Sequence, residues 1–178
     1  MKKCTGILLL GIVALAASPL YAQDATPTTV TVIKQSYEGI KNNIMKAADK
    51  MPEDGYAFKP TPEEMSFGGW LNHVAQAQTA ICSRAAGAAK NMDASAKTSK
   101  ADVQAALKES FDTCDAVYSG LTDANSNDSV PSFRGNTTRL AALAGNVIHD
   151  NECYGSMAVY LRLKGIVPPS TEGRGRGR

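Results

Sequence analysis

A short segment in the C-terminal part of the sequence, GNVIHDNECYGSM (residues 145–157), carries side chains that can bind a metal ion. His149 and Cys153 are four residues apart, so on a helix their side chains point in the same direction. Two helical ligands at this spacing can reach one ion, and imidazole nitrogen and thiolate sulfur are both ordinary ligands of zinc. The segment therefore predicts half of a metal site.

Two ligands do not hold a catalytic metal, and the only other histidine of the chain, His73, is the candidate for the third. His73, His149 and Cys153 would leave one position of a tetrahedral ion open, as in catalytic rather than structural zinc sites. The carboxylates of Asp150 and Glu152 are candidates to orient an imidazole or to act as a general base. The alternative is that both histidines are hydrogen-bonded interior residues without a metal.

Four helical segments must position these side chains, because apolar residues recur at every third or fourth position in four parts of the chain. The segments are residues 29–51, Ser66 to about Gly87, Ser99 to about Leu121, and Thr137 or Thr138 to Gly165. No part of the sequence shows the alternation that is typical of a strand. We therefore predict an all-α four-helix bundle.

The apolar stripe of the last segment turns polar for one helical turn at Asp150 or Asn151 and then resumes. The apolar residues on either side of this turn are Leu140, Leu143, Val147, Tyr154, Met157 and Leu161. His149 and Cys153 lie beside the polar turn, so the metal ligands are expected at the edge of the bundle core.

The N-terminal residues 1–22 have the pattern of a secretory signal peptide. Lys2 and Lys3 precede an apolar run, and Leu20-Tyr21-Ala22 is a plausible cleavage site. We expect an exported bacterial protein, periplasmic or secreted and without a membrane span. Its domains would be the bundle over residues 23–170 and a flexible basic tail over residues 171–178.

Charge and motifs argue against several classes of function. The chain has 19 Lys and Arg against 17 Asp and Glu, and removing the leader removes two lysines, which leaves 17 of each. Three of the remaining positive charges lie in the tail GRGRGR, so the bundle itself is mildly acidic and no nucleic-acid partner is expected. The tail is expected to affect solubility or surface binding, with nucleic-acid binding as the alternative. The sequence has no GxSxG motif and no glycine-rich phosphate loop.

Three cysteines remain outside the leader, namely Cys82, Cys114 and Cys153. An exported protein meets an oxidising environment in which cysteines pair. An odd number leaves one thiol that must be free, bound to a metal or paired with another chain.

Several motifs in this order resemble the DinB-like family of bacterial four-helix bundles, also called DinB/YfiT-like. They are MPEDGYAFKPTPEEMSFG, SFGGWLNHVAQAQ around His73, HDNECYG around His149, and YLRLKGIVPPS at residues 160–170. The resemblance covers nearly all of the chain after the leader. It implies an up-down-down-up bundle, a homodimer, and one divalent metal ion, zinc or nickel, held by three histidines.

One family histidine comes from the second helix and two from an HxxxH pair on the fourth, which places the ligands at His73, His149 and Cys153. The usual HDNEH is HDNEC here. Thiolate is a softer zinc ligand, so one consequence is a His2Cys site with altered metal preference. The other is a site that has lost its metal.

Some members of the family are transferases or isomerases that use bacillithiol, mycothiol or glutathione. The resemblance therefore implies a metal-dependent transferase or hydrolase that acts on a small molecule of unknown identity. Two alternatives stay open. One is a non-catalytic envelope or binding protein with a vestigial metal pocket, and the other is a redox role for Cys153, alone or in an intermolecular disulfide.

The up-down-down-up order that the resemblance implies also makes the second and third helices parallel. Cys82 lies about sixteen residues into the second helix and Cys114 about fifteen into the third. The two thiols would then lie at similar heights, so we predict a disulfide between them that leaves Cys153 for the metal. The alternative is that both are small buried apolar residues.

Overall fold

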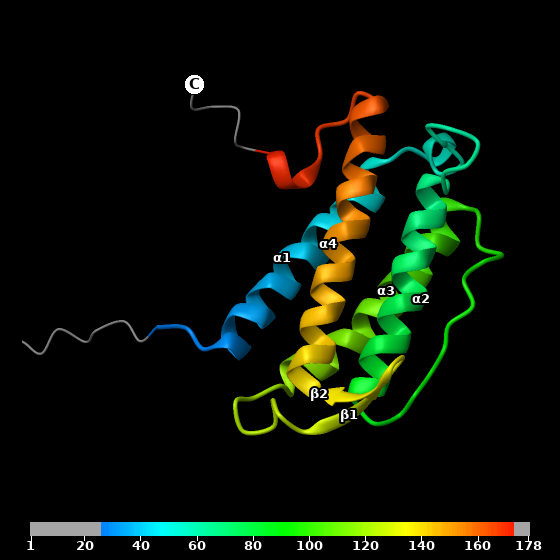
Figure 1. The fold of residues 1–178 in the computed structure, drawn as a ribbon. Helices are drawn as coiled ribbons and strands as arrows, with labels where there is room; N and C mark the ends of the chain where they lie inside the picture. Colours follow the sequence, from blue (N-terminus) through cyan, green and yellow to red (C-terminus); the bar gives the residue numbers. More distant parts are fainter. Residues whose placement is uncertain (1–25, 173–178) are drawn as a thin grey trace, which may run out of the picture.

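The computed structural model describes residues 26–172, which form four long helices and a short hairpin (Figure 1). The helices are α1 (Thr29–Lys50), α2 (Phe67–Ala85), α3 (Lys100–Ser119) and α4 (Arg139–Leu163). Two 3-10 turns, η1 (Glu53–Gly55) and η2 (Pro169–Thr171), and two strands, β1 (Ser129–Ser132) and β2 (Gly135–Thr138), complete the described elements. The predicted four-helix bundle is confirmed. The predicted signal peptide and the GRGRGR tail lie outside the described residues.

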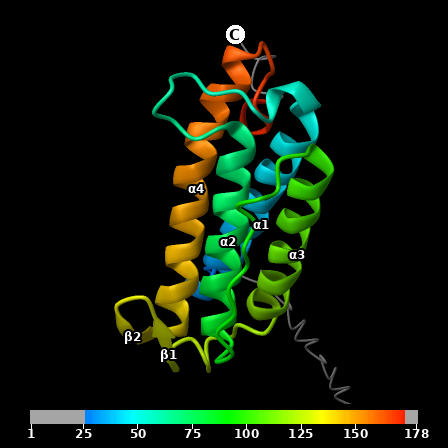
Figure 2. The same ribbon diagram turned by 90° about the vertical axis from the view of Figure 1, so that its right-hand side faces the viewer.

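The bundle has the expected up-down-down-up order, with α2 and α3 running opposite to α1 and α4 (Figure 2). Lys100, at the start of α3, donates to the carbonyl of Asp49 at the end of α1. Arg139, at the start of α4, donates to the carbonyl of Ala85 at the end of α2. Each contact joins the beginning of one helix to the end of another, which requires antiparallel pairs.

The helices begin where the sequence predicts a cap. The hydroxyls of Ser66, Ser99 and Thr138 accept hydrogen bonds from backbone N–H groups three residues on, which satisfies donors that the first helical turn leaves without a partner. Beyond α2 and α4 the chain turns at Gly87 and Gly165, whose φ angles are 79° and 73°. A left-handed glycine after the last turn is a common end of a helix.

The expectation of no strand is wrong for one short hairpin. Strand β1 pairs with β2 in antiparallel register, from Ser129 opposite Thr138 to Ser132 opposite Gly135. Each strand has four residues, and among them only Val130 is buried, so no alternating pattern marks the hairpin in the sequence. The hairpin leads directly into α4, because Thr138 is both the last residue of β2 and the residue that caps the helix.

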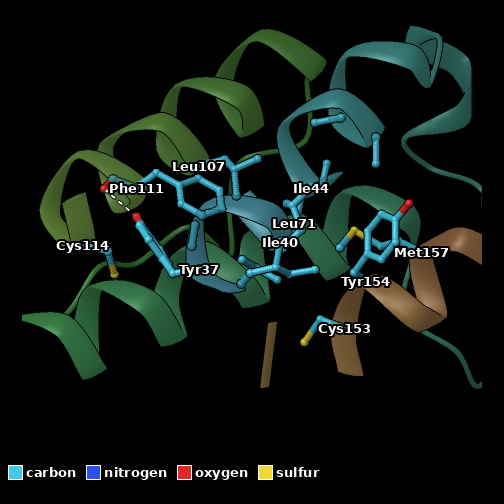
Figure 3. Close-up of a cluster of buried hydrophobic side chains, with 14 of the residues drawn as sticks. Tyr37, Ile40, Ile44, Leu71, Leu107, Phe111, Cys114, Cys153, Tyr154 and Met157 are labelled. Atoms are coloured by element: carbon cyan, nitrogen blue, oxygen red, sulfur yellow. Dashed lines mark hydrogen bonds between the residues drawn. The ribbon is translucent and has the colours of Figure 1, made fainter. Parts of the chain in front are cut away.

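The bundle core is apolar and rich in aromatic side chains (Figure 3). The rings of Tyr37 and Tyr118 are stacked with their centroids 3.8 Å apart, and Tyr37 donates to the Asp115 carboxylate at 2.6 Å. Cys153 lies at the edge of the cluster that Figure 3 shows. Across residues 26–172, no helix combines the length and the apolar character needed to span a membrane.

The structure contains the predicted disulfide between Cys82 and Cys114, with their Cα atoms 5.2 Å apart. Both residues lie in the last part of their helices, as expected for parallel neighbours. Cys153 has no disulfide partner among the described residues and is buried. The odd thiol is therefore the one on α4, beside the predicted metal ligands.

Candidate metal centre

The antiparallel contact between α2 and α4 brings the two histidines of the chain face to face. His73 Nε2 and His149 Nε2 are 3.0 Å apart. One turn further along α4, Cys153 Sγ lies 3.7 Å from His149 Nε2. The three donor atoms all lie within 4.8 Å of one another, so the structure brings the three predicted ligands together.

This arrangement fits a tetrahedral ion. Zinc bonds of about 2.0 to 2.3 Å place donor atoms about 3.3 to 3.6 Å apart on the edges of a tetrahedron. The observed separations of 3.0 Å between the two Nε2 atoms and 3.7 Å between Nε2 and Sγ differ from these by a few tenths of an ångström. The donor atoms of His73 and Cys153, the third pair, lie within 4.8 Å of each other, so rotation of the side chains would place all three ligands around one ion.

The three candidate ligands differ in how far their side chains are exposed to solvent. Cys153 is only 2% exposed, His149 is half-buried, and His73 is exposed. The two histidines line a groove of about 600 Å³ between α2 and α4, together with Asn91 and Met92 from the segment that connects α2 to α3. The thiol therefore forms the inner side of the site, and the groove forms its open side.

Asp150 supports His149 from inside the bundle. Its carboxylate is fully buried, with Oδ1 3.5 Å from His149 Nδ1. Asn146, also fully buried, donates to Asp150 Oδ2 at 3.2 Å. A carboxylate on Nδ1 orients the imidazole so that Nε2 faces the metal position, an arrangement common for histidine ligands. Glu152 is exposed on α4 and lies outside the group of three ligands.

The surroundings of the two histidines shift their pKa values in opposite directions. Hydrogen bonds with Asp150 and Cys153 hold the pKa of His149 above its usual value, against the opposing effect of burial. Burial and the nearby charge of His149 lower the pKa of His73. Burial also raises the pKa of the Asp150 carboxyl, although its hydrogen bond with His149 opposes this. The pKa values of the two facing histidines are therefore shifted in opposite directions.

Two parts of the site are not predicted by the sequence analysis. Asn146 is a fully buried amide on the inner face of α4, and the signal for it is a polar residue one turn before the polar turn of the apolar stripe. The groove is lined by Asn91, Met92 and Phe133, which lie in irregular or hairpin segments. No periodicity marks such residues, and only the fold places them beside the histidines.

Comparisons with known proteins agree with this fold. The family model of the DinB superfamily matches residues 37–156. A crystal structure of a DinB-like protein from Bacillus cereus is similar, with a TM-score of 0.66 and 20% identity over 77% of this chain and 93% of that chain. A DinB-like protein from Bacillus subtilis gives a TM-score of 0.60 and 18% identity over 75% of this chain and 92% of its own. A search among curated proteins finds no match. Since the family match spans more than half of the sequence, the chain belongs to the DinB superfamily.

Proposed function

We propose that the protein binds one divalent metal ion through His73, His149 and Cys153, with an open position that faces the groove. The observation that carries this proposal is the convergence of the three donor atoms within 4.8 Å. They come from the only two histidines of the chain and from the only cysteine of the described residues without a disulfide partner. A random placement of such scarce residues would rarely bring all three together.

The charges near the site support a divalent ion. A metal-bound cysteine is a thiolate, and Asp150 contributes a second negative charge through its contact with His149. Together the two charges would balance a 2+ ion held between the buried thiol and the groove. The thiolate, as a softer ligand than imidazole, favours zinc over harder divalent ions such as Mg²⁺ or Mn²⁺.

The chemistry that follows is transfer or hydrolysis on a small molecule. A divalent ion in this position would act as a Lewis acid on a substrate group at the open position. The groove beside it is lined by the two histidines, by amides and by apolar side chains, and no carboxylate lines it. Asp150 and His149 would therefore act by holding the site in place, and the exposed His73 is the chain's ligand nearest to an incoming molecule.

We further propose that the protein is exported and functions in an oxidising compartment. The Cys82–Cys114 disulfide supports this, because such bonds form and persist in the periplasm and outside the cell. The leader pattern in residues 1–22 supports the same location.

Metal content tests the proposed site. The protein is exported to the periplasm, purified without chelating tags, and measured by inductively coupled plasma mass spectrometry. We expect about one zinc or nickel ion per chain, and loss of most of it in His73→Ala, His149→Ala and Cys153→Ser. Glu152→Ala, an exposed neighbour on α4, is the matched control and should keep the metal.

A wild-type protein without metal, even after incubation with zinc, would contradict the proposal. The reading that remains would then be a non-catalytic DinB-like scaffold. Equal metal content in the wild type and in Cys153→Ser would exclude the thiol as a ligand.

A further inference from the structure

A second hollow adjoins the metal groove at the hairpin end of the bundle. It has a volume of about 820 Å³ and lies between α2, α4 and the β1–β2 hairpin. Ile81 and Phe133 line both this hollow and the groove of about 600 Å³ that contains His73 and His149. The two spaces therefore form one path from the hairpin to the metal centre.

The hairpin end of this path is positively charged. Arg84 and Arg134 line it, and neither forms an ion pair within residues 26–172. The Arg84 guanidinium stacks on the Phe133 ring at 4.4 Å, and one of its N–H groups donates to the carbonyl of Ala80 in its own helix. No Asp or Glu lines either hollow. Two uncompensated guanidinium groups with free donors favour an anion.

Between its two ends, the path is lined by apolar side chains that are exposed to solvent. Phe133 is 66% exposed and Ile148 is 69% exposed, although both are large apolar residues. Both line the larger hollow, where a ligand would cover them. Removing this apolar surface from water favours a ligand with an apolar body.

We propose that the path binds an elongated organic anion, with its carboxylate at Arg84 and Arg134 and its apolar body against Phe133 and Ile148. The far end of the molecule would then reach His73. Arg84 follows His73 by eleven residues on the same helix, a rise of about 16 Å. The ligand class is thus an amphipathic carboxylate with a body of roughly ten atoms. This inference rests on the proposed metal site only for the contact between the far end of the ligand and the metal ion.

A charge series of one probe tests this inference. The ligands are 6-phenylhexanoate, 6-phenylhexan-1-ol and 6-phenylhexylamine, which share one body and differ in the charge of the head group. Binding is measured by calorimetry on the mature protein after removal of metal with a chelator. Trp70, the only tryptophan of the chain, lies 6.1 Å from the His73 ring between centroids, so its fluorescence reports arrival at the far end.

We expect the carboxylate to bind at least about tenfold more tightly than the alcohol, and the amine to bind least. Arg84→Gln should weaken the carboxylate about tenfold and leave the alcohol unchanged, and Phe133→Ala should weaken both. Arg84→Lys, which keeps the charge, should retain part of the preference. Arg162→Gln is the matched control, because Arg162 likewise donates to a carbonyl of its own helix but lies outside the path.

Failure of this inference is distinguishable from failure of the metal site, because the measurement uses metal-free protein. Absence of carboxylate binding, equal binding of the amine, or an Arg84→Gln variant with unchanged preference would each overturn it. Carboxylate binding together with an absence of metal in the purified protein would uphold this inference and contradict the proposed function.

Discussion

Helix α2 has two interfaces that contain cysteine, and they differ in construction. Against α3, Cys82 and Cys114 are fully buried and joined in a disulfide. Against α4, His73 faces His149 beside an open groove, and Cys153 at its inner side has no disulfide partner within residues 26–172. The first interface is closed by a covalent bond, whereas the second has the three donor atoms of the proposed metal site beside an open groove.

The difference follows from what lies opposite each sulfur. Parallel packing places Cys82 and Cys114 at the same level with a Cα separation of 5.2 Å, within the normal range for a disulfide. Beside Cys153 lies the imidazole of His149 from its own helix, and antiparallel packing places His73 of α2 against this imidazole. The same residue type therefore forms a disulfide at one face of α2 and is a proposed metal ligand at the other.

The largest expected effect comes from removing the closed interface. Replacing both Cys82 and Cys114 with alanine should lower the free energy of unfolding by roughly 3 to 4 kcal/mol, because the bond closes a loop with a sequence separation of 32. Urea denaturation measures this loss. Metal content should stay at the wild-type value, and a loss of metal in this variant would show that the two interfaces depend on each other.

Metal removal tests how much the open interface between α2 and α4 contributes to the free energy of unfolding. At a free zinc concentration one hundred times Kd, binding should stabilise the fold by about 2.7 kcal/mol. For a domain of this size, this corresponds to a Tm increase of roughly 5 to 10 °C. Thermal unfolding with zinc and with a chelator measures the shift. The Cys82/Cys114 double alanine variant should keep it, and Cys153→Ser should lose it; the opposite pattern would reverse the roles given to the two interfaces.

Asp150→Asn separates orientation of the ligand from ligation itself. Since Asp150 contacts His149 Nδ1 and no metal ligand is removed, we expect metal affinity to fall about ten- to a hundredfold while the stoichiometry stays near one. Competition with a chromophoric chelator gives the affinity. Glu152→Gln is the control, because that side chain is exposed. Equal affinities for Asp150→Asn and the wild type would remove Asp150 from the site.

The smallest expected effect is a loss of stability at alkaline pH, and it involves the buried Tyr37 on α1 and Tyr118 on α3. Burial raises the pKa values of Tyr37 and Tyr118 well above the usual value, and the hydrogen bond to Asp115 raises that of Tyr37 further. Their contribution to stability is complete below the unfolded pKa of about 10 and is lost as pH rises above it. At pH 10 the loss should be about 0.4 kcal/mol per tyrosine, measured by urea denaturation.

Absorbance at 295 nm gives an independent measure of the same effect. The two phenols should ionise only when the protein unfolds, and Tyr37→Phe should remove one of them from the unfolding step. Ionisation of both phenols near pH 10 in the folded protein would show that this part of the core is open to water.

Much of this architecture could be predicted from local signals. The caps at Ser66, Ser99 and Thr138 lie where hydroxyl residues precede an apolar period, and a hydroxyl there satisfies backbone donors whatever the rest of the fold does. The convergence of His73 with His149 could be predicted because the only two histidines of the chain both occur beside helical apolar stripes. The disulfide needed one more fact, the direction of the helices, which the family resemblance implied.

The groove could not be predicted, because it depends on contacts between distant segments. Phe133 reaches Arg84 across 49 positions of sequence, from a hairpin whose strands have four residues each. Asn91 and Met92 line the groove from a segment without regular structure. Exposed or half-buried residues in such segments have no period, so their position relative to the histidines is known only from the folded chain.

The direct connection between the hairpin and α4 has a consequence for dynamics. Because Thr138 ends β2 and caps α4, no hinge residue separates the two elements. The backbone N–H groups of Arg139 and Leu140 also donate to the carbonyls of Asp128 and Ser126, which fixes the base of the hairpin. This connection therefore opposes a swinging motion of the hairpin as a lid. Access past Phe133 would depend on rotation of its exposed side chain, a motion of picoseconds to nanoseconds, so that loop opening would not limit the rate of ligand exchange.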